Sequence, residues 1–146
     1  MPVATHPEPV TLTRALRTFL GLPGRHATIA TVNADGSPHQ TVVWYLLRDD
    51  HILLNSLPGR RWPANVRRDR RASLTVEDGW DAVTLTGEVE TDGDNVDQAR
   101  RDIAEMAYRY MAPDDAARVI EERFSREPRI RCIFRPTSVH THGDPR

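Results

Sequence analysis

The chain has 146 residues with 20 basic and 21 acidic side chains, and all 20 basic residues are arginine. Because lysine is absent, the sequence excludes mechanisms that need a side-chain amine, such as a Schiff base or a P-loop phosphate contact. A single cysteine, Cys132, excludes an internal disulfide and a CxxC metal or redox site.

The length fits one compact domain, because a chain of about 150 residues buries roughly 68–70% of its unfolded surface. No apolar run approaches the roughly 20 residues that span a bilayer, and the first residues lack the pattern of a secretion signal. We therefore expect a single domain over residues 1–146 with a cytoplasmic location. Residues 1–10, which are rich in proline, are expected to form a loose arm.

The predicted elements begin with a short helix that Thr11 or Thr13 can cap and that ends near Gly21. A short helix is also expected over residues 61–69, and two more follow the capping residue Asn95 and Pro113. Alternating or β-branched patterns predict strands over residues 26–33, 40–47, 51–56, 72–76, 82–90 and 129–135. Short turns between the strands favour an antiparallel sheet or small barrel over an alternating βα fold.

The segment over residues 55–69 is the most informative local feature. It combines a strand end, the turn Pro58-Gly59, the adjacent pair Arg60 and Arg61, and a helix N-terminus. Free N–H groups at a helix start favour an anion, and arginine can hold a phosphate with paired donors. An alternative is a solvated basic helix face that pairs with the acidic residues between positions 77 and 97.

Three segments in this order are similar to one known superfamily: ATVNADGSPHQTVVWYL, NSLPGRRWPANVRRDRRASLTVEDG and VTLTGEVE. They resemble the pyridoxamine 5'-phosphate oxidase-like split β-barrel superfamily, in particular its F420-dependent flavin/deazaflavin oxidoreductase branch. The likeness runs from about residue 26 to about residue 140. It implies a mainly β (α+β) fold, namely a six-stranded antiparallel split β-barrel with Greek-key topology and flanking helices. It also implies a homodimer with cofactor sites at the subunit interface.

The resemblance indicates where such a cofactor binds. Its ring system is expected along the strand residues 41–44, and its phosphate at the strand end and turn over residues 55–61. Arg61 takes a position that is usually lysine in the flavin-phosphate oxidases, and the ending RPTSVHTHG replaces the C-terminal pattern of true pyridoxamine phosphate oxidases. The predicted cofactor-binding residues are Thr41, Val42, Val43, Trp44, Asn55, Ser56, Arg60, Arg61, Trp62, Asn65 and Arg68.

The cofactor predicted from charge is coenzyme F420. FMN carries one terminal phosphate, whereas F420 carries a phosphodiester and several carboxylates, which fits the surplus of arginines over residues 67–71. We expect an F420H2-dependent oxidoreductase that transfers a hydride between the deazaflavin and a planar conjugated organic substrate. Since the cofactor carries the hydride, no catalytic side chain is required.

Other functions remain open at this point. One is an FMN-binding oxidoreductase of the same fold, and another is a non-catalytic carrier of a deazaflavin or another planar ligand. Nucleic-acid binding through residues 60–71 is the least favoured, because the net charge is -1, and no membrane partner is expected. His140 and His142 would share a face of a strand, but the sequence offers no third ligand, so no metal site is predicted.

Overall fold

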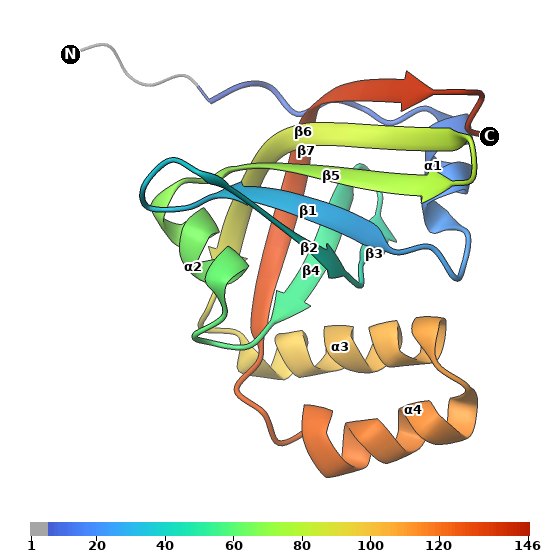
Figure 1. Cartoon of the computed structure of the whole chain (residues 1–146). Coiled ribbons are helices and arrows are strands. Elements are labelled where there is room, and N and C mark those ends of the chain that lie inside the picture. Colours follow the sequence, from blue (N-terminus) through green and yellow to red (C-terminus); the bar gives the residue numbers. More distant parts are fainter. Residues whose placement is uncertain (1–5) are drawn as a thin grey trace.

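Seven antiparallel strands form one strongly curved sheet in the computed structural model, which describes residues 6–146 (Figure 1). Their order across the sheet is β2-β1-β5-β6-β7-β4-β3. The sheet curls into a half-open barrel with helices beside it, which confirms the expected fold class. The strands are β1 (Ala27–Val32), β2 (Pro38–Val43), β3 (Leu46–Arg48), β4 (His51–Ser56), β5 (Arg71–Asp78), β6 (Asp81–Asp92) and β7 (Ile130–His142).

The expected count of six strands is wrong, because the apolar run over residues 40–47 forms two strands. β2 and β3 lie at opposite edges of the sheet, and the chain crosses between them at Trp44 and Tyr45. Tyr45 is fully buried, and its hydroxyl donates to the Leu20 carbonyl at 2.6 Å. Burial raises the pKa of Tyr45 to about 12, so this donor stays protonated. A continuous apolar run indicates that its residues are buried. It does not indicate where the chain leaves one strand and begins to pair with another.

The last strand is longer than predicted. β7 continues past residue 135 to His142, because it pairs with almost the whole of β6. The pairing contains one irregularity between Thr86 and Gly87, where Thr137 of β7 has no paired residue on β6. Such a bulge increases the local twist and helps a sheet to curl.

Within residues 6–146, four helices and one π-helical turn flank the sheet. Thr13 caps the first helix, since its hydroxyl accepts from the Leu16 N–H at 3.2 Å, and Asn95 caps the third by accepting from the Gln98 N–H at 3.3 Å. Both predicted caps are therefore confirmed. The third and fourth helices form a pair at one end of the sheet (Figure 1). The helices are α1 (Arg14–Gly21), α2 (Arg61–Arg68), α3 (Val96–Tyr110) and α4 (Pro113–Val119), followed by η1 (Ile120–Phe124).

Two apolar clusters stabilise this arrangement. The larger fills the inside of the curved sheet with residues such as Ile29, Leu74 and Phe134. The smaller lies where β3 and β4 pack on the helical pair and includes Leu53 and Met106. Cys132 belongs to the larger cluster, and burial raises the pKa of its thiol to about 11. A thiol in this state is a small apolar side chain rather than a nucleophile.

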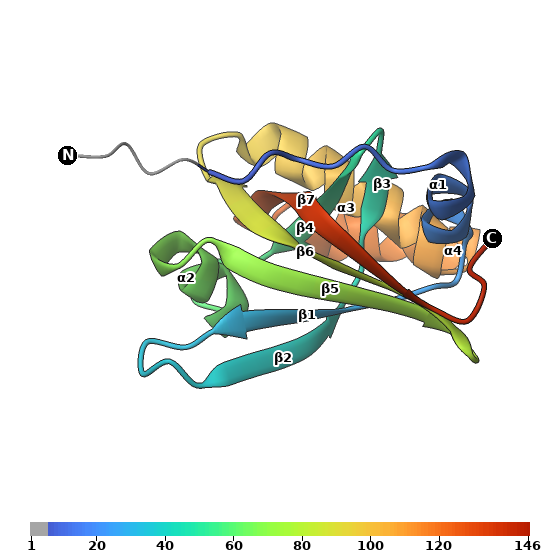
Figure 2. The ribbon, with the colours of Figure 1, turned by 90° about the horizontal axis from the view of Figure 1, so that it is seen from above.

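Residues 6–13 run over the sheet toward α1 (Figure 2). Residues 1–5 of the expected loose arm lie outside the described residues. His6 Nδ1 lies 3.0 Å from Glu88 Oε2, and the Val10 N–H donates to the Pro136 carbonyl at 2.9 Å. Within residues 6–146, no helix has the length and the apolar character that crossing a membrane requires.

Candidate functional site

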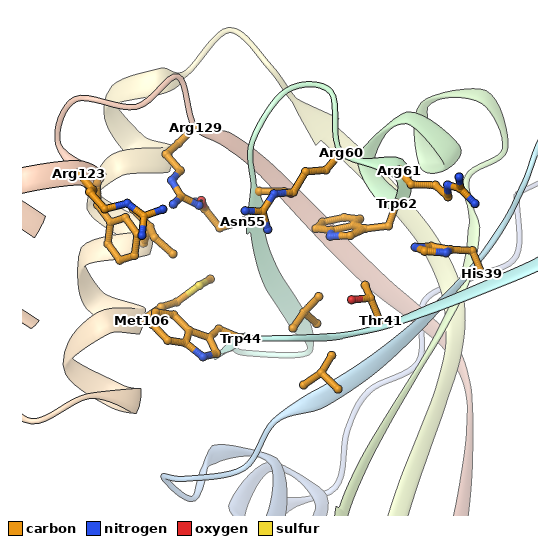
Figure 3. A pocket seen from close by; sticks show the side chains of 15 residues that line it. His39, Thr41, Trp44, Asn55, Arg60, Arg61, Trp62, Met106, Arg123 and Arg129 are labelled. Atoms are coloured by element: carbon orange, nitrogen blue, oxygen red, sulfur yellow. The ribbon is translucent and has the colours of Figure 1, made fainter. Parts of the chain in front are cut away.

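A cavity of about 490 Å³ lies between β2, the end of β4, the first turn of α2 and the helical segment from α3 to η1 (Figure 3). Most of the predicted cofactor-binding residues line it. The structure thus brings residues 41–44 close to residues 55–62, two segments that the sequence connected only through the family resemblance. The predicted residues that line the cavity are Thr41, Val42, Val43, Trp44, Asn55, Ser56, Arg60, Arg61 and Trp62.

The turn between β4 and α2 gathers the polar part of this set. Gly59 has a φ of 88°, a left-handed conformation that glycine adopts at little cost, and it directs the chain from Ser56 into the helix. Arg60 is the N-cap residue of α2 but makes no side-chain capping bond. The first N–H groups of a helix have no partner within the helix, so this turn offers donors to a ligand.

Ser56 is the polar residue at this end of the cavity that most strongly indicates a ligand position. Its side chain is only 2% exposed, and its hydroxyl has no hydrogen-bond partner among residues 6–146. A buried hydroxyl without a partner costs free energy, so such an atom is typical of a position where a ligand oxygen binds. Arg60 and Arg61 line the same cavity. This combination fits an anionic group such as a phosphate.

Asn55 is held firmly at the cavity wall. Its Nδ2 donates to the Ala99 carbonyl of α3 at 2.7 Å, and its Oδ1 accepts from Arg129 Nη1 at 3.4 Å. Asn55 therefore joins the sheet to the helical segment. It fixes the wall of the cavity in addition to any contact with a ligand.

Aromatic and apolar side chains form the other end of the cavity. Trp44 stacks on Tyr110 with ring centres 5.1 Å apart and an angle of 11° between the planes, and meets Phe124 edge-on at 6.3 Å. Figure 3 shows Met106 beside Trp44. These rings and the thioether can exclude water from a planar ligand.

The sequence did not point to several residues of the cavity. Ile103 and Phe124 lie in the segments after Asn95 and Pro113 that were predicted to be helical, but nothing in the sequence placed those segments beside β2 and β4. The sequence did not indicate that Arg123 and Arg129 line a cavity, since isolated arginines are usually solvated. The additional lining residues are His39, Ile103, Met106, Arg123, Phe124 and Arg129.

Asn65 and Arg68 do not line the cavity, although they were predicted to face the same ligand. Positions 61, 65 and 68 share one side of α2, and that side runs along the β1–β2 hairpin. Only its first turn reaches the cavity. Asn65 Nδ2 donates to Thr31 Oγ1 and to Asn33 Oδ1, both at 3.0 Å, and Arg68 donates to Asn65 Oδ1 at 3.1 Å. These two residues thus attach α2 to the end of β1.

The remaining arginines of the basic segment also lie away from the cavity. Arg67, Arg70 and Arg71 are exposed, and Arg71 pairs with Asp69 at 2.7 Å. Arg68, Arg70 and Arg71 line a separate, shallower groove beside Glu88. The surplus charge near residue 70 therefore does not point into the cavity.

Comparison with solved structures agrees with the fold. An F420 reductase is 19% identical with a TM-score of 0.68, and the match covers 88% of this chain and 98% of that protein. A conserved hypothetical protein from Mycobacterium tuberculosis is 21% identical with a TM-score of 0.70, covering 97% and 91%. A FAD-binding protein from Mesorhizobium loti is 21% identical with a TM-score of 0.61, covering 90% and 95%. At these identities the likeness establishes the fold.

Sequence comparison identifies the family. No curated protein matches the chain. The family model described as pyridoxamine 5'-phosphate oxidase matches residues 12–130, which include every predicted cofactor-binding residue and most of the sheet. The chain therefore belongs to the pyridoxamine 5'-phosphate oxidase family.

Proposed function

We propose that this protein is an oxidoreductase that binds a deazaflavin cofactor of the F420 type in the cavity and transfers a hydride between it and a planar conjugated organic substrate. The observation that supports this most is the convergence of the buried, unpartnered Ser56 hydroxyl with Arg60 and Arg61 in one cavity. The residues present fit the phosphate of such a cofactor. The name of the structurally similar F420 reductase supports the same choice.

Each part of the cavity has a distinct task in this proposal. Ser56, Arg60 and Arg61 hold the phosphate, while residues 41–44, at the end of the edge strand β2 and just beyond it, orient the ring system. Trp44 and the helical segment opposite exclude water and leave one face for the substrate. When bound, the cofactor supplies the hydride chemistry, so the chain contributes binding, orientation and electrostatics.

The charge of the cavity favours F420 over FMN. Four arginines line it, and no Asp or Glu of the described chain does. FMN offers one phosphate, whereas F420 offers a phosphodiester and several carboxylates. A lining with this excess of cations is better matched by the ligand with more negative groups, because each charge-assisted contact stabilises the complex. The arginines in question are Arg60, Arg61, Arg123 and Arg129.

Parallel titrations with F420 and FMN test the proposal. Trp44 and Trp62 line the cavity, so we expect F420 to quench the intrinsic fluorescence strongly and FMN to do so weakly. The protein should then catalyse the oxidation of reduced F420 by a planar conjugated acceptor, which takes up the hydride, as followed by absorbance. Binding of FMN alone would contradict the cofactor assignment. Tight F420 binding without turnover on a panel of acceptors would favour the carrier function.

We also propose that the protein forms a homodimer through the outer face of the sheet. Two neighbouring cross-strand rows cross this face over five strands, and none of their members is Asp, Glu or Arg. In a chain with 28% charged residues, such a strip without Asp, Glu or Arg is suited to a second copy of itself. Val42 belongs to this face and also lines the cavity, so the interface would border the site. The rows are Val42-Thr28-Thr75-Thr84-His140 and Gln40-Ala30-Ser73-Thr86-Ser138.

The variant Ala30→Arg tests this surface, because Ala30 belongs to one of the two rows and is partly exposed. It lies on β1, next to the edge strand β2. The new guanidinium would be buried without a partner in each half of a symmetric interface, so we expect a monomer in sedimentation velocity where the unaltered protein is a dimer. Ala117→Arg is the matched control, since Ala117 is exposed on α4, and should remain dimeric. A dimeric Ala30→Arg protein would place the interface elsewhere.

A further inference from the structure

Two of the cavity arginines come from the segment between α4 and β7 rather than from the turn before α2. Arg123 belongs to η1, and Arg129 immediately precedes β7. Figure 3 shows both on the α3 side of the cavity, across from Trp62 and Arg61. They therefore form a second cationic wall that the phosphate-binding turn does not include.

Arg129 is an unusual cation because it is buried. Its side chain is 7% exposed, its guanidinium lies 4.6 Å above the Phe124 ring, and its Nη2 donates to Glu127 Oε2 at 2.6 Å. Its Nε has no hydrogen-bond partner in the part of the chain that the structure describes. Burial lowers the pKa of the Arg129 guanidinium, and Glu127 opposes this effect. A buried charge with a free donor is costly unless a ligand completes its hydrogen bonds.

Glu127 accepts hydrogen bonds from both arginines. Its Oε1 accepts from Arg123 Nε at 3.2 Å, while Oε2 accepts from Arg129. One carboxylate between two guanidinium groups fixes their positions but balances only one of the two positive charges. The pair thus keeps a net positive charge toward the cavity that Arg123 and Arg129 line.

Apolar groups lie next to this pair. Phe124 contacts both guanidinium groups, with Arg123 5.9 Å and Arg129 4.6 Å from its ring centre. Trp44 meets the Phe124 ring edge-on, and Met106 lines the cavity beside Trp44 (Figure 3). A ligand that enters here meets an aromatic surface and a cation together.

We propose that Arg123 and Arg129, positioned by Glu127, form a second anion subsite that binds a carboxylate beside the aromatic surface of Phe124 and Trp44. The proposal deepens the proposed function and rests on it only for the origin of the carboxylate, which belongs either to the substrate or to the cofactor. Both sources share the chemistry that the subsite recognises. Planar carboxylates suit arginine, because its donors match the two oxygens.

A pair of matched probes tests the subsite without any cofactor. 2-Naphthoate and the neutral 2-naphthamide share one planar body, and fluorescence quenching of the purified protein reports their binding. We expect naphthoate to bind at least about tenfold more tightly than the amide, since charge-assisted hydrogen bonds are the stronger ones. The preference should be lost in Arg123→Gln and Arg129→Gln. Arg118→Gln is the control, because Arg118 is an exposed arginine of α4 that pairs with Asp115, and should keep the preference.

The outcomes separate this subsite from the proposed cofactor. Because the probes are titrated into the protein alone, failure of the F420 titration leaves this test intact. Naphthoate binding to the F420-saturated protein assigns the carboxylate to a substrate, and competition with F420 assigns it to the cofactor. Equal affinity for naphthoate and naphthamide overturns the proposal, as does an unchanged preference in Arg123→Gln. Arg123 is exposed, so that variant decides even if Arg129→Gln does not fold.

Discussion

Replacing Arg60 and Arg61 together by alanine is expected to abolish measurable F420 binding. Hydrogen bonds to charged groups contribute about 1.5–3 kcal/mol each, and about 1.4 kcal/mol changes a Kd tenfold. Losing both guanidinium groups should therefore weaken binding by at least about 100-fold. Both residues are exposed and begin α2, so the thermal unfolding of the variant should stay close to that of the unaltered protein. Fluorescence titration with F420 gives the affinity, and circular dichroism gives the melting temperature.

The double variant Arg67→Ala and Arg70→Ala is the matched control. It removes the same charge from the same basic segment, but both residues are exposed and neither lines the cavity. Its F420 affinity should change by no more than the small, salt-dependent amount that long-range charge produces. Equal losses in the two double variants would show that net charge attracts the ligand without a defined contact. Unchanged affinity in Arg60→Ala and Arg61→Ala would contradict the assignment of the phosphate site.

The sequence predicted the secondary structure well where a local signal was present. The caps at Thr13 and Asn95 were correct because an N-cap depends only on neighbouring residues. The change of partner between β2 and β3 was missed, since it depends on where Tyr45 is buried in the barrel and not on the apolar run itself. The length of β7 was missed for the same reason, because its end is set by pairing with β6.

The candidate site was predictable to the extent that it is local in sequence. Ser56, Arg60 and Arg61 fall within one short segment that joins a strand to a helix, so their joint position follows from the turn. Arg68 shows the limit of this reasoning, because the helix face that it shares with Arg61 leaves the cavity after one turn. The place of Arg129 in the cavity could not be predicted from the sequence, since it depends on how the helical segment packs on β4.

The variant Gly87→Ala is expected to destabilise the fold strongly. Gly87 lies at the irregularity in the pairing of β6 with β7, where an added Cβ would lie 2.1 Å from the Arg135 carbonyl oxygen and 2.9 Å from Pro136 Cα. These are backbone atoms of the paired strand, so they cannot rotate away as a side chain can. Overpacking costs typically 1–3 kcal/mol, and we expect about 3 kcal/mol here, or a melting temperature roughly 6–12 °C lower.

Gly21→Ala separates this steric effect from the general consequence of replacing glycine. Gly21 ends α1, and a Cβ there would lie 3.9 Å from Leu47 Cδ2, an ordinary contact. Alanine has the higher helix propensity, so this variant should melt at or slightly above the temperature of the unaltered protein. If Gly87→Ala melted at the same temperature as Gly21→Ala, β6 and β7 could move apart at the bulge without loss of stability. The close approach at Gly87 would then not be what holds the curvature of the sheet, and the bend would have to come from the packing of the core beneath it.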